Sequence, residues 1–240
     1  ANASNYTFYT GLREIIKHYN RYFFYETNVG AGLPLIDTIK YLYKSGDSIT
    51  KIRGVFSGSL SYILNTYSLS DYTFSKILKE AVSMGLTEPD PKEDLCGLDV
   101  ARKLLILSRE IGQKVEIDEF SIESLIPHKL QNTSIDFFWN NIKLFDTYFD
   151  EIKNNQAPNH VLQYIGEFDG KNHSVKLVSI PKNSTFGQLK GTDLVFEIFT
   201  ERYNSNPLII QGAYARAEKT AIGVLSDVLK LGQLIKHKVR

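Results

Sequence analysis

The feature that most constrains the fold is a set of β-strand patterns, most of them in the last third of the chain. HVLQYIGEF (160–168) and HSVKLVSIP (173–181) flank the turn residues DGKN, which is typical of a β-hairpin. TDLVFEIFTERY (192–203) alternates strongly, and NPLIIQG (206–212) is a further short strand. Because ITKIRGVFSG (49–58) alternates in the same way, the strands predict a sheet to which an early segment also contributes.

Helical patterns occupy much of the remaining chain. Residues 134–155 form the clearest one, because Phe138, Ile142, Phe145 and Phe149 recur at intervals of three and four. A core-facing stripe explains this pattern better than an aromatic binding site does. We expect an aromatic-rich strand at 21–27 and further helices over 8–19, 33–46, 59–68, 74–85, a stretch ending near Gly112, and 217–236.

Since helices and strands are interleaved, we predict an α+β fold in which helices pack on one face of a mixed β-sheet. The net charge of +1 gives no basic field for nucleic acid, and a single cysteine, Cys96, excludes an intramolecular disulfide. No apolar run reaches the roughly 18 residues that a membrane span needs. We therefore expect a cytoplasmic protein without nucleic-acid or membrane partners.

The sequence lacks the patterns of several common catalytic sites. Its five histidines are scattered, without the H-x-x-x-H or C-x-x-C spacing of a transition-metal site. There is no G-x-S-x-G motif of a serine hydrolase and no Walker loop of a nucleotide kinase. Metal-dependent and simple nucleophilic chemistry are therefore not expected.

Residues 85–105, GLTEPDPKEDLCGLDVARKLL, carry the most unusual charge pattern. Four carboxylates, among them Glu88 and Asp94, fall within seven residues and could hold an ammonium group. Asp99 and Lys103 then share one face of the helix that follows. Apolar neighbours lower the pKa of such a lysine and Asp99 raises it, which suits a general acid or base. A solvated acidic loop followed by an ordinary helix ion pair would give the same pattern.

A second candidate region is YETNVGAGLP (25–34). Gly30 and Gly32 make only a G-x-G, since Leu35 stands where a dinucleotide fingerprint has its third glycine. A simple turn explains this run. Two glycines before a helix that begins at proline also leave backbone groups free to hold a cation or a ligand.

Together, four motifs resemble the homoserine dehydrogenase family. They are YETNVGAGLP, GVFSGSLSYILN (54–65), GLTEPDPKEDLCGLDVARKLL and SLIP (124–127), and they follow the family's order and spacing. The likeness extends over essentially the whole chain, and its style is that of bifunctional aspartokinase–homoserine dehydrogenases. The resemblance implies NAD(P)-dependent interconversion of L-homoserine and L-aspartate 4-semialdehyde, within threonine and methionine biosynthesis.

The resemblance also implies roles for individual residues. Lys103 would be the acid/base for the substrate oxygen, and Asp99 its partner. Glu88 and Asp94 would hold the substrate's ammonium group. The matched positions further imply a substrate pocket lined by Gly58 and Ser59, a Na⁺ or K⁺ site at Glu26, Val29, Ala31 and Leu33, and cofactor contacts at Gly30, Gly32 and Gly212.

By the same resemblance, the chain is an excised catalytic and dimerisation region without the G-x-G-x-x-G domain that binds the dinucleotide. Residues 1–24 would be a closing piece of that Rossmann domain. Residues 25–211 would be the catalytic and dimerisation domain, and 212–240 a helix returning toward the nucleotide-binding domain. We expect a homodimer or higher homo-oligomer, and we expect the isolated chain not to oxidise homoserine.

Residues 211–223 depart from the family's pattern. Tyr214 and Arg216 stand where glycines are expected. Their side chains would obstruct a cofactor unless Arg216 pairs with a phosphate, and drift in a fragment that no longer binds cofactor explains them equally well. The alternative to a catalytic region is therefore a non-catalytic dimerisation or assembly module, or a degenerate homologue, although the intact acidic cluster and Lys103 favour the enzyme.

Overall fold

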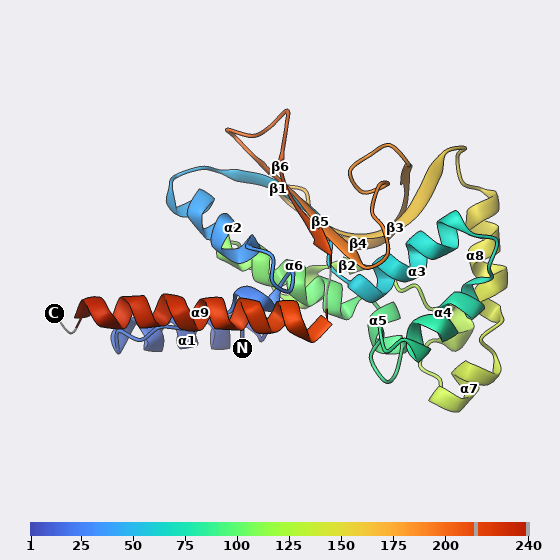
Figure 1. Ribbon diagram of the computed structural model, residues 1–240, viewed down its shortest axis with the longest axis horizontal. Helices are drawn as coiled ribbons and strands as arrows, with labels where there is room; N and C mark the ends of the chain where they lie inside the picture. Colours follow the sequence, from blue (N-terminus) through green and yellow to red (C-terminus); the bar gives the residue numbers. More distant parts are fainter. Residues whose placement is uncertain (214–215, 239–240) are drawn as a thin grey trace.

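A mixed β-sheet forms the centre of the chain, whose computed structural model describes residues 1–213 and 216–238. The strands lie in the order β2-β4-β3-β1-β5-β6, and Figure 1 shows helices gathered on one side of them. Neighbouring strands are antiparallel except β2 and β4, which are parallel. The predicted α+β class is confirmed. The strands are β1 (Ile49–Val55), β2 (Ser121–Ile122), β3 (His160–Phe168), β4 (His173–Pro181), β5 (Asp193–Thr200) and β6 (Leu208–Ala213).

Two glycines allow aromatic side chains to pack on the middle of the sheet. Gly54 of β1 pairs with Gly166 of β3. A Cβ on Gly54 would lie 2.5 Å from the Phe196 ring, and one on Gly166 would lie 2.8 Å from the Phe56 ring. The two rings meet edge to face, with centroids 5.0 Å apart, so the glycines provide the space for this core contact.

The helices that carry the core lie against this sheet. Helix α3 (Gly58–Leu69) packs on β3 and β5, and α6 (Leu98–Glu110) packs on β3 and β4. Helix α4 (Phe74–Ser83) lies next to α3 and α8. The remaining helices are α1 (Tyr6–His18), α2 (Leu35–Lys44), α5 (Lys92–Leu95), α7 (Ile135–Asn140), α8 (Leu144–Asn154) and α9 (Arg216–Lys238), with 3₁₀ turns η1 (Glu26–Asn28), η2 (Ile117–Glu119) and η3 (His128–Leu130).

The apolar stripe predicted over 134–155 is buried, but the single helix predicted there is wrong. Phe145 and Phe149 are buried with Phe74, which stacks on Phe149 at 3.7 Å between centroids. The helix breaks between α7 and α8, where the Asn141 side-chain amide donates to the Phe137 carbonyl at 2.9 Å. Asparagine side chains compete for backbone groups in this way, which weakens a helix interior.

The strand predicted at 21–27 is also wrong. Residues 21–25 form no strand, and the turn η1 follows them. Tyr25 instead packs between two cations, since Arg13 and Lys40 lie 4.5 and 3.8 Å from its ring centroid. Its hydroxyl donates to Glu110 at 2.7 Å. A run of aromatic residues therefore favours a strand locally, but cation–π contacts with other elements can hold such residues in another conformation.

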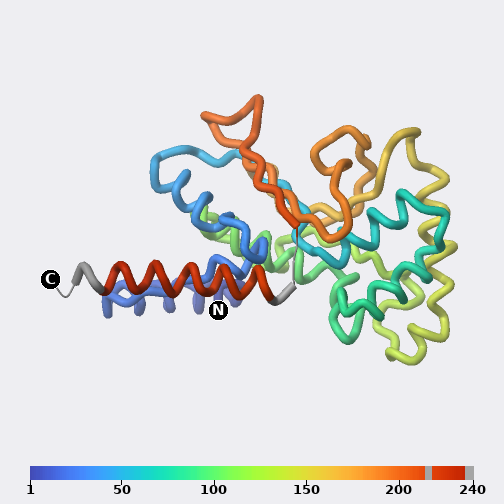
Figure 2. The backbone as a smooth tube through the Cα atoms, in the orientation of Figure 1, coloured from blue at the N-terminus to red at the C-terminus, as the bar shows by residue number. Residues whose placement is uncertain are grey.

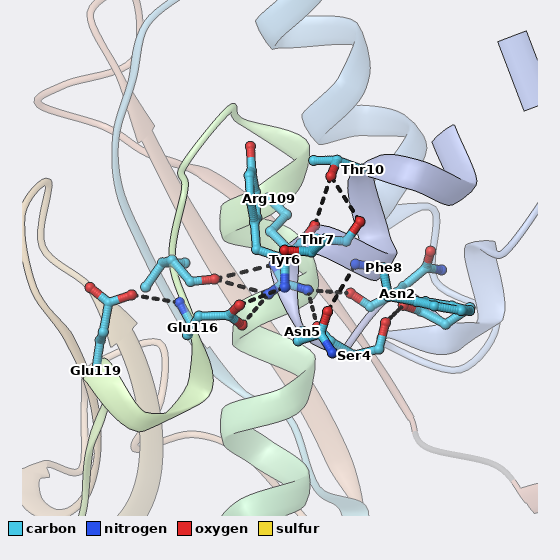
Figure 3. Close-up of polar contacts among 12 residues, drawn as sticks. Asn2, Ser4, Asn5, Tyr6, Thr7, Phe8, Thr10, Arg109, Glu116 and Glu119 are labelled. Atoms are coloured by element: carbon cyan, nitrogen blue, oxygen red, sulfur yellow. Dashed lines mark hydrogen bonds and ion pairs between the residues drawn. The ribbon is translucent and has the colours of Figure 1, made fainter. Parts of the chain in front are cut away.

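A buried arginine fastens the beginning of the chain to the end of α6 (Figure 3). The Arg109 guanidinium donates to the carbonyls of Asn2 and Ser4 at 3.1 and 2.6 Å, and to the Glu116 carboxylate at 2.9 Å. The other oxygen of Glu116 accepts from the Tyr6 amide at 2.6 Å, at the start of α1. These charge-assisted bonds satisfy a buried cation and place α1 beside α6.

The terminal helices leave much apolar surface uncovered. Helix α1 contains no buried residue, and Phe8, Ile15 and Tyr19 are exposed. Helix α9 extends away from the sheet (Figure 2) and exposes further large apolar side chains, including Leu225 and Leu229. In the part of the chain that the structure describes, no helix has both the length and the apolar character to cross a bilayer.

Candidate functional site

The first turn of α3, the segment before α5, α5 itself and the first half of α6 surround a cavity of about 510 Å³. One side of the cavity comes from residues 57–59 and the other from residues between 86 and 103, so the two sides are far apart in sequence. All six residues predicted for catalysis or substrate binding lie in its wall. They are Gly58, Ser59, Glu88, Asp94, Asp99 and Lys103.

The amino terminus of α3 contributes one wall. Ser57 caps the helix, since its hydroxyl oxygen accepts from the Leu60 amide at 3.3 Å. The amides of Gly58 and Ser59 belong to the first turn, where a helix has no intrahelical acceptor for them. This end of α3 therefore presents N–H groups and a positive partial charge, which suit an anion such as a carboxylate.

Asp94 is held rigidly at the base of the cavity. One of its oxygens accepts from the Ser59 hydroxyl at 2.5 Å and the other from the Glu88 amide at 2.8 Å. The Ser57 and Ser59 hydroxyls lie 2.8 Å apart. Burial raises the pKa of Asp94, although the two hydrogen bonds oppose that increase. A partly dehydrated carboxylate in a fixed position is a suitable partner for an ammonium group.

Lys103 stands on the α6 wall. Its amine lies 2.7 Å from the Asp99 carboxylate and donates to the Phe56 carbonyl at 3.1 Å. Its side chain is 22% exposed, against 54% for Asp99. The predicted apolar surroundings apply to the neighbouring side chains of the helix, but the amine itself contacts two oxygens. The ion pair is thus oriented by a carbonyl that follows β1, which the helical spacing alone does not reveal.

A sharp bend separates α5 from α6 and sets the angle between the acidic and basic walls. Gly97 has φ = 81°, and a Cβ there would overlap the Tyr164 hydroxyl of β3. That hydroxyl donates to the Glu123 carbonyl. The helix predicted to end near Gly112 is α6, which begins after this bend at Leu98 and ends at Glu110.

Six further residues line the cavity that were not among the predicted site residues: Ser57, Leu86, Glu93, Cys96, Leu98 and Arg102. Leu98 and Arg102 lie four residues apart on α6, next in sequence to Asp99 and Lys103. Their spacing of four residues places these two side chains on one face of the helix, which is the signal that could have found them. Arg102 is exposed and is the second cation of the wall.

The predicted cation site lies on a different turn, and none of its four residues lines the cavity. The Glu26 carboxylate caps α2, since its two oxygens accept from the Ile36 and Asp37 amides at 2.8 and 2.9 Å. Burial and the neighbouring Asp37 raise the pKa of Glu26 to about 7. Val29 and Ala31 are buried and Leu33 is half-buried on the turn that follows.

The three glycines predicted to contact a cofactor accommodate packing within the chain. A Cβ on Gly32 would lie 2.7 Å from the Lys219 carbonyl of α9, and one on Gly212 would lie 2.8 Å from Leu33. Gly30 has φ = 78°, a value that favours glycine. Their cofactor contacts stay a prediction. Tyr214 and the Arg216 side chain lie outside the described residues.

Comparisons with known proteins identify the family. The family profile described as homoserine dehydrogenase matches residues 34–229. The chain is 44% identical over 222 residues to homoserine dehydrogenase of Saccharomyces cerevisiae, covering 89% of this chain and 62% of that protein. It is 41% identical over 239 residues to a bifunctional aspartokinase/homoserine dehydrogenase of Zea mays, named as chloroplastic, covering 98% of this chain and 26% of that one.

Solved structures share the fold. A crystal structure of a Candida auris protein of unknown function matches with a TM-score of 0.81 and 42% identity, over 88% of this chain and 61% of that one. A hyperthermophilic archaeal homoserine dehydrogenase in complex with NADPH matches in fold alone, with a TM-score of 0.69 and 23% identity, over 93% of this chain and 59% of that one. The chain thus spans only part of the proteins it matches. On the extent of the profile match, the chain belongs to the homoserine dehydrogenase family.

Proposed function

We propose that this chain is the substrate-binding and catalytic region of an enzyme that interconverts L-homoserine and L-aspartate 4-semialdehyde with NAD(P). The observation that carries the proposal is one cavity whose lining includes Asp94, Lys103 and the amino-terminal residues Gly58 and Ser59 of α3. An amino-acid alcohol has an ammonium, a carboxylate and a hydroxyl, and the cavity offers one complementary group for each.

Each substrate group has a partner of the right charge. Asp94 and Glu88 attract the ammonium group. The amides of Gly58 and Ser59 donate to the carboxylate, because they lie at the positive end of α3. Lys103 contacts the hydroxyl, and Asp99 keeps its amine in place at 2.7 Å. Three fixed contacts of this kind orient the alcohol carbon for reaction.

The chain's own catalytic task is to move one proton. NAD(P), when bound, accepts the hydride that leaves the alcohol carbon. Lys103 in its neutral form takes the hydroxyl proton as the carbonyl forms, and in the reverse direction its ammonium form protonates the developing alkoxide. A well-placed proton transfer contributes about 10²–10⁴-fold to a rate. The Phe56 carbonyl and Asp99 hold the amine at the position where this transfer occurs.

Binding of L-homoserine to the isolated chain tests the proposal. Calorimetric titration should detect binding, and Asp94→Asn should weaken it by about tenfold or more, since a charge-assisted contact is lost. Asp118→Asn, on an exposed turn, makes the same charge change away from the cavity and should leave the affinity unchanged. Equal affinity for the wild type and Asp94→Asn would remove the proposed ammonium site.

We further propose that the isolated chain does not turn over homoserine, because it contains no G-x-G-x-x-G motif to hold the dinucleotide. The absorbance of NADPH, followed with homoserine and NADP⁺, should not rise above the background rate. Robust production of NADPH would contradict this part of the proposal while leaving the substrate site intact.

We also propose that the turn after η1 binds Na⁺ or K⁺ through Glu26 and the backbone oxygens of Val29, Ala31 and Leu33. The positive φ values of Gly30 and Ala31, 78° and 55°, support this, because they curl the turn tightly between these carbonyls. The melting temperature should then be higher in KCl or NaCl than in tetramethylammonium chloride at equal ionic strength. Equal values in all three salts would exclude the site.

We also propose that the chain forms a homodimer, a property that a non-catalytic module would share. Strand β6 is at the edge of the sheet and exposes Ile209, and edge strands offer unpaired backbone groups to a partner. Sedimentation should give twice the chain mass. A chain that dimerises but does not bind homoserine would favour the assembly module over the enzyme region.

A further inference from the structure

Helix α5, which carries Asp94, is part of a wall that two cavities share. Glu93 and Cys96 line the substrate cavity and also a second cavity of about 400 Å³, whose remaining lining comes from residues 90–92 and 124–132. Close packing keeps an element in place through many small contacts, and a wall with a cavity on each side has fewer of them. The position of α5 therefore depends strongly on individual bonds.

Two such bonds tie α5 to the segment that follows β2. At its carboxyl end, the Leu125 amide donates to the Leu95 carbonyl at 2.9 Å. At its amino end, the Lys92 amine donates to the Thr133 carbonyl at 2.7 Å and lies 3.5 Å from the Asp90 carboxylate. The Lys92 side chain is 19% exposed, so this charge-assisted bond is largely shielded from water. Both ends of the short helix are thus fastened.

The segment that accepts the lysine is itself fixed. Leu130 is fully buried, and the Thr133 hydroxyl donates to its carbonyl at 2.8 Å. The Gln131 side-chain amide donates to the Ile126 carbonyl at 2.9 Å. Ile126 belongs to the SLIP motif (124–127), to which the proposed substrate contacts give no role. The motif and the turn after it therefore provide a rigid acceptor for the amine.

Lys92 lines the second cavity and not the substrate cavity, but it lies two residues before Asp94. A shift of α5 would stretch the bonds that the Ser59 hydroxyl and the Glu88 amide donate to Asp94. We propose that Lys92 is a positioning residue, which binds the Thr133 carbonyl and so holds the Asp94 carboxylate where the ammonium group of the substrate binds. This inference rests on the proposed function and adds to it a residue outside substrate contact.

The charge of Lys92 separates this role from a simple electrostatic effect. A cation near the acidic loop repels the ammonium group of a substrate, so removal of the charge alone would tighten binding. Loss of the positioning role would weaken binding, because the Asp94 carboxylate would no longer be held in one place before the substrate arrives. The two effects have opposite signs.

Calorimetric titration of the isolated chain with L-homoserine measures this sign. Lys92→Met should weaken binding about fivefold, as part of the contribution of a charge-assisted hydrogen bond is lost. Lys92→Arg should restore most of the affinity, because a guanidinium can donate to the same carbonyl. Lys129→Met, the same charge change on the exposed turn η3, should not weaken binding.

A double-variant cycle tests whether Lys92 acts through Asp94. In a chain that already carries Asp94→Asn, the further change Lys92→Met should have no additional effect on the affinity, because the carboxylate that it positions is gone. Tighter or unchanged binding by Lys92→Met alone would overturn the positioning role. The same fivefold loss in the Asp94→Asn chain would overturn it as well.

Hydrogen exchange measured without substrate keeps this test separate from the proposed function. The Glu88 amide, which donates to Asp94, should exchange about tenfold faster in Lys92→Met and at the wild-type rate in Lys129→Met. Unchanged exchange at Glu88 in Lys92→Met would contradict the positioning role. Faster exchange there, in a chain whose wild type does not bind homoserine, would support the hold on Asp94 and contradict the proposed function alone.

Discussion

The cavity and the terminal helices differ in whether their side chains find partners within the chain. At the cavity, Asp94 and Lys103 each have two polar partners, one close by in sequence and one from a distant element. On α1 and α9, by contrast, large apolar side chains face outward without a cover. The difference teaches that the polar groups of the cavity are held in place by the chain itself, whereas the terminal helices leave apolar side chains exposed.

The largest expected effect concerns the cavity. In a complete enzyme that contains this chain, Lys103→Ala should lower kcat by about 10²–10⁴-fold, since the proton acceptor is lost. The Lys114→Ala variant, away from the cavity, provides the matched control and should keep the wild-type kcat. Steady-state kinetics with homoserine measure both. Near-normal turnover by Lys103→Ala would show that Lys103 is not the acid/base, although its amine has two polar partners.

The second prediction compares the packed core with α9. Phe149→Ala should lower the free energy of unfolding by about 3–5 kcal/mol, because it empties a fully buried ring position. Leu229→Gln, at a side chain that is 60% exposed, should change it by less than about 0.5 kcal/mol. Urea denaturation of the two variants measures the difference. A large loss at Leu229 would mean that α9 is covered in solution, for example by a second copy.

The third prediction tests whether the two regions are independent, since α6 contributes to both. Arg109, whose side chain is 0% exposed, holds the start of the chain to the far end of α6. Arg109→Met should destabilise the protein by about 3 kcal/mol, because the carbonyls of Asn2 and Ser4 and the Glu116 carboxylate lose their buried donor. Hydrogen exchange in α1 should accelerate, while the affinity for homoserine should change by less than twofold. A parallel loss of affinity would show that α6 couples the regions.

The smallest effect is a pH dependence at the cavity alone. Burial raises the pKa of Asp94 above that of an ordinary aspartate. Only the carboxylate form attracts an ammonium group, so affinity for homoserine is full above the raised pKa and falls as the pH decreases through it. Titrations at successive pH values should place the onset of this loss above the usual aspartate range. A loss that begins only near pH 4 would imply that Asp94 is hydrated in solution.

Local patterns predicted much of the fold, and non-local contacts account for what they did not predict. The alternation of side-chain polarity located β3, β4 and β5, because successive residues of a strand face opposite sides of the sheet. The two-residue strand β2 is too short to leave such a pattern, and its parallel pairing with β4 depends on the tertiary fold. The aromatic run ending at Tyr25 was mistaken for a strand because its cationic partners come from α1 and α2.

The same distinction holds at the cavity. The spacing of Asp99 and Lys103 predicted their ion pair, because both lie on one helix. The Ser59–Asp94 hydrogen bond joins positions 35 residues apart, so its geometry could not be predicted from spacing. The family resemblance placed both residues in one pocket. It gave no role to the Phe56 carbonyl or to Arg102, although both lie within the matched motifs.

The tight fit of Gly97 against Tyr164 has a consequence for how variation spreads through the molecule. Gly97 joins α5 to α6, and it packs so closely on the Tyr164 hydroxyl of β3 that even one added methyl group would overlap it. Substitutions in β3 or β4 that tilt Tyr164 would therefore change the distance between α5, which carries Asp94, and α6, which carries Lys103. Changes that reshape substrate preference can arise in the sheet itself, at positions that never meet the ligand.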